Sequence, residues 1–349
     1  MSGSSAPSLP PVNGEVIVSH GGELITAAAA IGNRSSGTVQ VIGYGSTWTN
    51  SGSIQIAATS SCQGLLAVRN GAEVITDELV VGYQNSQSTG RLLVEGYDAT
   101  LTSLGNTYIG LRAYGYVELK QGASFSSNNV YIGGGQGCSI CDGHVTVIGS
   151  ATRWVSTGEF IVGVYAQGTL DIIAAQVSTI NARIGVRDTR SRGPVSSNAT
   201  VRGWGGTWTN QGLLRVGTDT GYGELNVGAY GTLVTEDTEV VSELGGGFVK
   251  VNDVYASWLN SGDVTITSRI NSSPSLLVDK HAFVSIGGVL RATTLVSAQF
   301  PSLGPSVRLA SGHLIAGAVE VGADDFDFAG GRLEIGSFAG ELANLQAGE

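Results

Sequence analysis

The sequence predicts an all-β fold, a right-handed single-stranded parallel β-helix (β-solenoid) of about 50-residue repeats, two coils per repeat. Three observations predict it. Glycine is unusually frequent, short strands with alternating apolar residues follow one another without a helical pattern, and the chain repeats itself at a nearly constant interval.

The composition excludes several other classes of protein. Glycine makes up 53 of 349 residues, and charged residues only 13%, about half the usual share. The glycines keep no period of three, which excludes collagen. A hydrophobic content of 42% argues against a disordered chain. Glycine interrupts almost every segment before a helix could grow, which argues against a helical bundle.

The charge balance excludes a nucleic-acid partner. The chain has 18 basic and 28 acidic residues, a net charge of −10. Nucleic acid binding needs a clustered basic face. The one local concentration of arginine, Arg183 to Arg192, is interrupted by Asp188 and indicates a solvated loop. No segment approaches 18 apolar residues, and the first residues lack the basic start and apolar core of a signal peptide.

The repeat begins with a glycine, an alternating run and often a second glycine. Its copies follow one another at intervals of 50, 51, 53, 55 and 51 residues. They start at Gly14, Gly64, Gly115, Gly168 and Gly223, with a degraded copy from Pro274. We therefore expect residues 1–13 to form a flexible N-terminal segment or partial cap and residues 14–349 to form a single β-solenoid domain.

Each repeat carries the same landmarks in the same order. After the opening strand, the next strand ends in an apolar residue followed by glycine, as in Ile31-Gly32, Val81-Gly82, Ile132-Gly133 and Ile184-Gly185; the fifth repeat has Val241-Ser242 instead. A tryptophan-centred turn comes next, as in STWTNSG at 46–52 and GTWTNQG at 206–212. A final strand closes the unit. Such units cannot bury an apolar face alone, but stacked units can.

A β-propeller is the main rival architecture, since its blades are of similar length. A propeller blade is an antiparallel meander and favours tight hairpins, whereas no two strands here are joined by a plain two-residue Asn-Gly turn. A coil of about 25 residues, stacked at roughly 4.8 Å, gives thirteen or so coils and a rod on the order of 60 Å long.

The repeat resembles that of bacterial autotransporter (type V secretion) and PEP-CTERM-associated proteins. The resemblance covers about residues 14–273 and is closest from Ser46 to Ile56; the stretch from Asp327 to Leu342 is similar to the segment after the last repeat in such passenger domains. It implies a secreted passenger fragment, extracellular or at the bacterial outer membrane. The membrane anchor or barrel of the family is then expected outside this chain.

Two columns of residues recur in the tryptophan turns. Trp48, Trp154, Trp208 and Trp258 share one column, with Leu101 in the second repeat. A leucine keeps apolar bulk but loses a face for stacking sugars, so packing is favoured over a carbohydrate platform. Trp204 lies outside this column, at a loop or corner.

The second column holds short polar side chains. It contains Asn50, Asn210 and Asn260, with Ser103 and Ser156 in the other repeats. We expect these side chains to form a structural ladder by bonding backbone amides of neighbouring coils at a corner.

The cysteines leave three alternatives open. Cys138 and Cys141 form a Cys-x-x-Cys that could be a redox dithiol, half of a metal site or a loop disulfide. A metal site lacks further ligands, and a redox centre lacks its βαβ context. We therefore expect a disulfide, no metal and no cofactor, with Cys62 a buried thiol.

No catalytic constellation is found, so we expect no enzyme. Asp77 and Glu78 in the second repeat and Glu236, Asp237 and Glu239 in the fifth are the candidate acids. They would lie roughly 30 Å apart along the rod and could not share one substrate bond.

The sequence thus predicts a structural rod with an adhesive or binding role in its loops, the longest near 84–90, 134–143 and 187–198. The expected partner is a host or cell-surface protein or glycan. The alternative is a polysaccharide-binding or polysaccharide-cleaving β-helix. The weakly charged last strand, LEIGSFAGEL, leaves an open sheet edge, which fits a truncated chain, further coils or end-to-end self-association.

Overall fold

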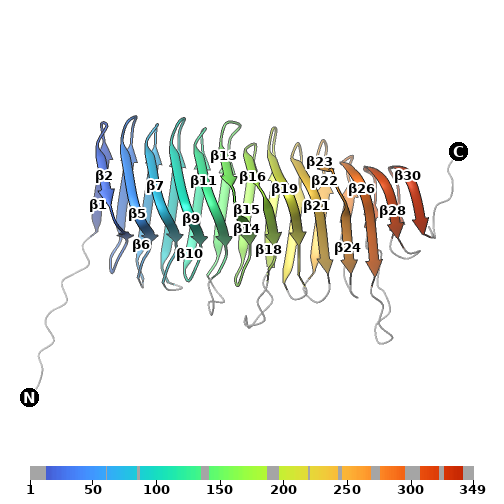
Figure 1. The fold of residues 1–349 in the computed structure, drawn as a ribbon, viewed down its shortest axis with the longest axis horizontal. Helices are drawn as coiled ribbons and strands as arrows, with labels where there is room; N and C mark the ends of the chain where they lie inside the picture. The colour runs from blue at the N-terminus through green and yellow to red at the C-terminus, as the bar shows by residue number, and fades with distance from the viewer. Residues whose placement is uncertain are drawn as a thin grey trace, which may run out of the picture.

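The computed structural model describes residues 13–59, 61–84, 87–134, 141–186, 196–218, 221–242, 246–268, 276–294, 307–321 and 326–340. Within these ranges the chain is all β, with no helix. The strands stack side by side along the long axis of the molecule, from the N-terminal coil at one end to the C-terminal coil at the other (Figure 1). The predicted parallel β-solenoid is confirmed.

One strand of each coil belongs to a 13-stranded parallel sheet, here called sheet A. Its strands, in spatial order, are β1 (Gly14–Ser19), β4 (Gly37–Ile42), β6 (Gln63–Arg69), β8 (Thr89–Glu95), β10 (Tyr114–Lys120), β12 (Gly143–Ile148), β15 (Gly168–Ile173), β18 (Ser196–Arg202), β20 (Tyr222–Val227), β22 (Gly247–Asn252), β25 (Leu276–Asp279), β27 (Val307–Leu309) and β29 (Phe326–Phe328).

The rest of each coil belongs to sheet B, which is also parallel throughout the described pairs. Its strands, in chain order, are β2 (Glu23–Thr26), β3 (Ala29–Ile31), β5 (Thr47–Ile56), β7 (Glu73–Val81), β9 (Thr100–Ile109), β11 (Ser124–Ile132), β13 (Arg153–Ser156), β14 (Glu159–Val162), β16 (Gln176–Thr179), β17 (Asn181–Ile184), β19 (Thr207–Val216), β21 (Thr232–Ser242), β23 (Ser257–Asn260), β24 (Val264–Ser268), β26 (Phe283–Thr294), β28 (His313–Val321) and β30 (Arg332–Gly340).

The register in sheet A confirms that each repeat holds two coils. Gly14 pairs with Gly37, Gly37 with Gly64, and Gly64 with Gly90. The successive differences in residue number are 23, 27 and 26. The 50-residue interval seen in the sequence is therefore the length of two coils. The second coil of each pair also opens with a glycine, such as Gly37, but its sequence is less similar to that of the first coil.

Sheet B bends in the middle of its long strands. The pairing of β5 with β7 slips between Asn50 and Ser53, and that of β19 with β21 slips after Asn210. In other coils the same place is an interruption that divides the strand in two, as between β13 and β14. Such irregularities bend a strand, and the bend lets the coil enclose an interior.

A single apolar core runs through the stacked coils from Val18 to Phe326. It arises from the period-two alternation, because successive side chains of a strand point to opposite faces. In β4, for example, Val39 and Val41 are buried whereas Gln40 faces outward.

Steric crowding explains why glycine follows the apolar residue at the end of these strands. Gly82 has φ +82°, and a Cβ there would lie 2.7 Å from the carbonyl oxygen of Tyr114 in the coil above. Gly185 has φ +76°, and its Cβ would lie 2.4 Å from the carbonyl oxygen of Tyr222. Only glycine fits both the dihedral angle and the space. Where the fifth repeat has Ser242, the strand β21 continues through that residue.

Candidate binding surface

The tryptophans of the predicted column lie inside the solenoid. Trp154, Trp208 and Trp258 are 0% exposed and Trp48 is 2% exposed. Each stacks in register on smaller residues of the next coils, as Trp208 does between Val177 and Leu233. Leu101, in the same column, stacks on Val74 and Phe125. This column fills the core and offers no face to a ligand.

The predicted polar column lies beside the tryptophans and is also buried. Its residues are joined by side chains more than by the expected backbone amides. Thr235 accepts the indole N–H of Trp258 at 2.8 Å and donates to the side-chain carbonyl of Asn260 at 2.7 Å. Asn210 and Asn260 donate to the carbonyl oxygens of Gly212 and Gly262 at 2.6 and 2.7 Å.

Asn50 continues the pattern at the N-terminal end. It accepts from Thr26 at 2.8 Å and donates to Thr76 at 3.1 Å, while the indole of Trp48 donates to Thr26 at 2.9 Å. Hydroxyls of the intervening coils, in register with this column, accept the N–H groups of the buried indoles: Thr26, Ser127, Thr179 and Thr235.

The backbone amides at the bend are bonded by other side chains, which sequence reasoning missed. Asn129 accepts the amide of Glu159, and Asn181 accepts that of Leu213. Asp237 accepts the amide of Asp263 at 2.9 Å. The sequence contained a signal for these acceptors, because Asn129, Asn181 and Asp237 each lie two positions after a hydroxyl residue in register with the polar column. The type of residue changes from coil to coil, which obscured the repeat.

The candidate catalytic acids are dispersed or already paired. Asp77 and Glu78 belong to β7, whereas Asp237 and Glu239 belong to β21, six strands away in sheet B and so about 29 Å along the rod. Glu239 forms an ion pair with Arg215 at 2.9 Å. Within the described ranges no three His, Cys, Asp or Glu side chains gather as metal ligands.

The cysteines divide into two kinds. Cys62 is buried and free, with its thiol 2.7 Å from the carbonyl oxygen of Gly32. Cys141 is buried and disulfide-bonded. Cys138 lies outside the described residues, so its pairing with Cys141 stays a prediction. Parts of the loops expected to carry binding, near 84–90, 134–143 and 187–198, also lie outside them, namely 85–86, 135–140 and 187–195.

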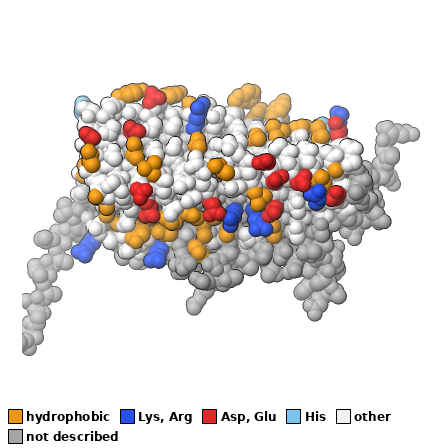
Figure 2. Space-filling model, in the orientation of Figure 1, with side chains coloured by type: hydrophobic (Ala, Val, Ile, Leu, Met, Phe, Trp, Pro, Cys, Tyr) orange, Lys and Arg blue, Asp and Glu red, His pale blue; other side chains and the backbone are white. Residues whose placement is uncertain are grey.

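The exposed aromatic residues gather on the turns that connect sheet A to sheet B. Trp204 is 79% exposed, Tyr44 and Tyr97 are each 71% exposed, and Tyr255 is 69% exposed. Figure 2 shows hydrophobic side chains along this upper edge of the molecule in two groups. Sequence reasoning placed Trp204 at a corner, as observed, but did not recognise that aromatic residues on later coils would join it.

Three of these residues form what we call the aromatic strip: Trp204, Tyr230 and Tyr255, on the turns before β19, β21 and β23. The ring centroids of Trp204 and Tyr230 are 5.4 Å apart, and those of Tyr230 and Tyr255 are 5.2 Å apart. The strip and Gly205 line an open depression of about 450 Å³ with no charged side chain in its lining.

The backbone fixes the strip in place. Gly203 donates to the carbonyl oxygen of Ala229 at 2.8 Å, and Tyr230 donates to that of Val254 at 3.3 Å, so the turns are bonded coil to coil. Each turn is closed by its own hydrogen bond, such as Gly206 N–H to the Gly203 carbonyl at 2.8 Å. The rings are therefore held on a preorganised edge.

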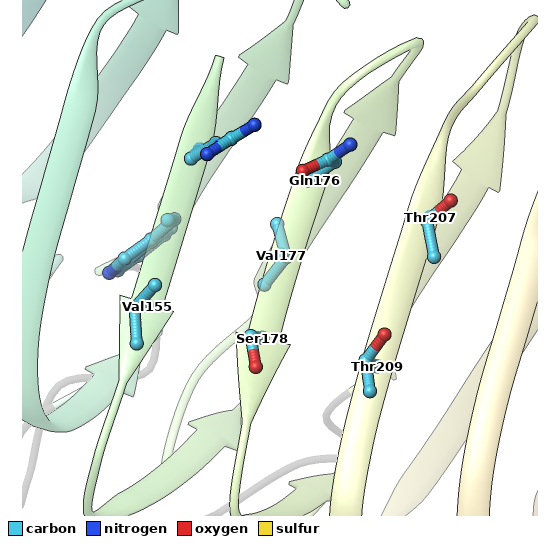
Figure 3. A pocket seen from close by; sticks show the side chains of 8 residues that line it. Val155, Gln176, Val177, Ser178, Thr207 and Thr209 are labelled. Atoms are coloured by element: carbon cyan, nitrogen blue, oxygen red, sulfur yellow. The ribbon is translucent and has the colours of Figure 1, made fainter. Parts of the chain in front are cut away.

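A second depression, of about 320 Å³, lies on the outer face of β13, β16 and β19 (Figure 3). Its rim nearest the turns is a row of polar residues in register, Arg153, Gln176 and Thr207. Thr207 comes three residues after Trp204, so this row begins where the turn that carries Trp204 ends.

The second aromatic group is built differently. A Cβ on Gly71 would lie 2.8 Å from the ring of Tyr44, and a Cβ on Gly122 would lie 2.7 Å from the ring of Tyr97, so each tyrosine covers a glycine of the next coil. The hydroxyl of Tyr44 donates to the carboxylate of Asp98, which raises the pKa of that phenol. The rings of Tyr44 and Tyr97 therefore fill the space beside Gly71 and Gly122, where a side chain is missing.

The part of the chain that the structure describes contains no helix that could cross a bilayer. Comparison with family models, curated proteins and solved structures finds no match to this sequence in any of the three. The chain is a β-solenoid protein.

Proposed function

We propose that this chain is an elongated, non-catalytic scaffold, an autotransporter-like passenger exposed outside the cell or at the bacterial outer membrane, which binds a host or cell-surface protein or glycan. The single observation that carries the proposal is that the repeated polar residues join one coil to the next instead of converging on a reactive centre. Such a molecule is suited to displaying groups along its length.

Two further observations support it. Cys141 is disulfide-bonded, as expected in an oxidising compartment outside the cytosol. The largest exposed apolar side chains stand on the edge turns, where a partner can reach them. The repeat pattern shared with autotransporter passengers suggests the same setting.

The proposal is tested with the purified full chain. We expect it to bind components of an array of glycans and immobilised extracellular-matrix proteins, and to release no reducing ends from common polysaccharides. Asp77→Asn and Glu78→Gln variants should behave as the parent in both assays. Polysaccharide cleavage that disappears in either variant would contradict the proposal and favour a polysaccharide-cleaving enzyme.

A further inference from the structure

We infer that the aromatic strip is a carbohydrate subsite that binds a neutral, linear oligosaccharide lying along the rod. This inference rests on the proposed binding role and deepens it by naming the ligand class and the place. A pyranose ring presents an apolar face of C–H groups together with hydroxyls. Tryptophan and tyrosine match it, because each has a large apolar surface and a polar group at one end.

The polar groups of the strip are open to a ligand. The indole N–H of each buried ladder tryptophan donates to a hydroxyl, as that of Trp208 does to Thr179 at 3.0 Å. Among the residues that the structure describes, no hydrogen-bond partner is found for the indole N–H of Trp204 or for the hydroxyls of Tyr230 and Tyr255. These groups can therefore bond to sugar hydroxyls.

The role of covering a glycine does not account for the strip. In the other aromatic group the rings of Tyr44 and Tyr97 cover glycines of the next coil. Trp204 holds the same second place in its turn, but the third place of the next turn holds Tyr230 instead of a glycine, and the two rings pack 5.4 Å apart. Exposing an indole at 79% forgoes burial that its apolar surface would favour.

The backbone of the two tyrosines lies in the left-handed region. Tyr230 has φ +60° and Tyr255 has φ +64°. Each is the third residue of its turn. The third residue in the turn that carries Trp204 is Gly205, which has φ +79°. A bulky residue in this left-handed region costs roughly 1–2 kcal/mol. Asp98 and His281 hold the same third place in other turns at φ +61° and +62°, so the strip is distinguished by its tyrosine rings and not by this dihedral angle.

The size and charge of the strip favour a sugar over a protein partner. Its three rings span two steps of about 5 Å. A stable protein interface buries roughly 1,200–2,000 Å² in total. The strip does not extend to the coil before it, whose corresponding turn presents only Ala174 and Ala175. The absence of charge in the lining suits a neutral glycan. The nearby row of Arg153, Gln176 and Thr207 offers hydrogen bonds to sugar hydroxyls, and its one charged residue, Arg153, lies two coils away from Thr207.

The test measures binding of cellohexaose and laminarihexaose to the full chain by calorimetry. We expect binding that weakens about tenfold in Trp204→Ala, the effect of losing one aromatic stacking contact. Trp204→Phe should retain most of the affinity. Tyr255→Gly should also weaken binding while the chain stays as stable as the parent, because glycine relieves the positive φ.

Tyr97→Ala is the matched control, an equally exposed aromatic residue on the same edge but outside the strip, and it should bind as the parent does. A second readout is acrylamide quenching of tryptophan fluorescence, which Trp204 should dominate and which bound oligosaccharide should reduce. The inference is overturned if neither oligosaccharide binds at millimolar concentration, or if Trp204→Ala binds as tightly as the parent. Binding of an extracellular-matrix protein by a chain that binds neither oligosaccharide would overturn this subsite while leaving the proposed scaffold role in place.

Discussion

At the scale of single residues, buried polar groups are the feature that makes this core specific. Successive coils carry a hydroxyl or amide at the position of Asn50, and the members of that column from Asn50 to Asn260 are buried. Buried polar groups are as a rule hydrogen-bonded, and the members of this column are, except for the Ser103 hydroxyl, which has no partner among the described residues. The column therefore ties the position of each indole to the coil below it.

Asn260→Ala should destabilise the protein by about 1–3 kcal/mol, because it removes the acceptor of Thr235 and of Thr238 at 2.7 and 3.0 Å and leaves both hydroxyls buried. Urea unfolding measures the effect. The control is Asn226→Ala, on the outer face of sheet A, where the side chain donates to Glu224 and water can replace the bond. Equal losses in the two variants would mean that burial of the column does not matter.

Asp263 should make stability depend on pH. The amide of Val289 and the guanidinium of Arg291, 2.6 Å away, lower the pKa of this carboxyl. A lowered pKa in the folded state adds stability that is present above the unfolded value of about 3.9 and is lost as the pH falls through the folded value.

Asp263→Asn should therefore be less stable than the parent at pH 7, and the difference should shrink below about pH 4. Thermal unfolding across pH 3–7 checks this. Asp171→Asn, which removes an outward carboxylate with no partner among the described residues, is the matched control. A pH-independent difference for Asp263→Asn would point to packing instead of charge.

At the scale of elements, the turns are set by where a Cβ can fit. Gly82→Ala should destabilise more than Gly43→Ala, although both glycines have positive φ. The control Gly43, at φ +90°, has nothing within 4 Å of the position of a Cβ. Alanine there should lower the free energy of unfolding by only about 1–2 kcal/mol, the cost of a left-handed backbone conformation. At Gly82 the carbonyl of Tyr114 must move as well. Similar losses in urea unfolding would show that the space is not limiting.

The strands and their repeat could be predicted from the sequence because both depend on alternation and spacing. The glycine landmarks and the tryptophan column could be read directly, since one residue type recurs at one interval. The intervening coils were harder: Val74, Phe125 and Val177 complete the tryptophan column but differ in type. The aromatic strip was harder still, because Trp204, Tyr230 and Tyr255 lie in turns of different sequence, and only the stacking of coils brings them together.

At the scale of the whole molecule, each described coil contacts its neighbours in sequence, so stability is expected to be a sum of coil and interface contributions. A consequence is that coils can be added. Duplicating residues 64–114, one whole repeat, would place Val74 of the second copy over Leu101 of the first, a pairing of the kind already present between β7 and β9. The two new coils should lengthen the rod by about 10 Å.

Small-angle X-ray scattering of the duplicated protein should show this longer maximum dimension, with an unchanged circular dichroism signal per residue. Duplicating residues 64–75 alone is the control: twelve residues supply the sheet A strand β6 and only the start of β7, so the coil cannot return and every later strand loses its register. We expect that variant to aggregate, because a slipped strand turns its apolar face to solvent. If the whole-repeat duplication aggregated as the partial one does, the coils would depend on their particular neighbours, and the additive picture of this rod would be wrong.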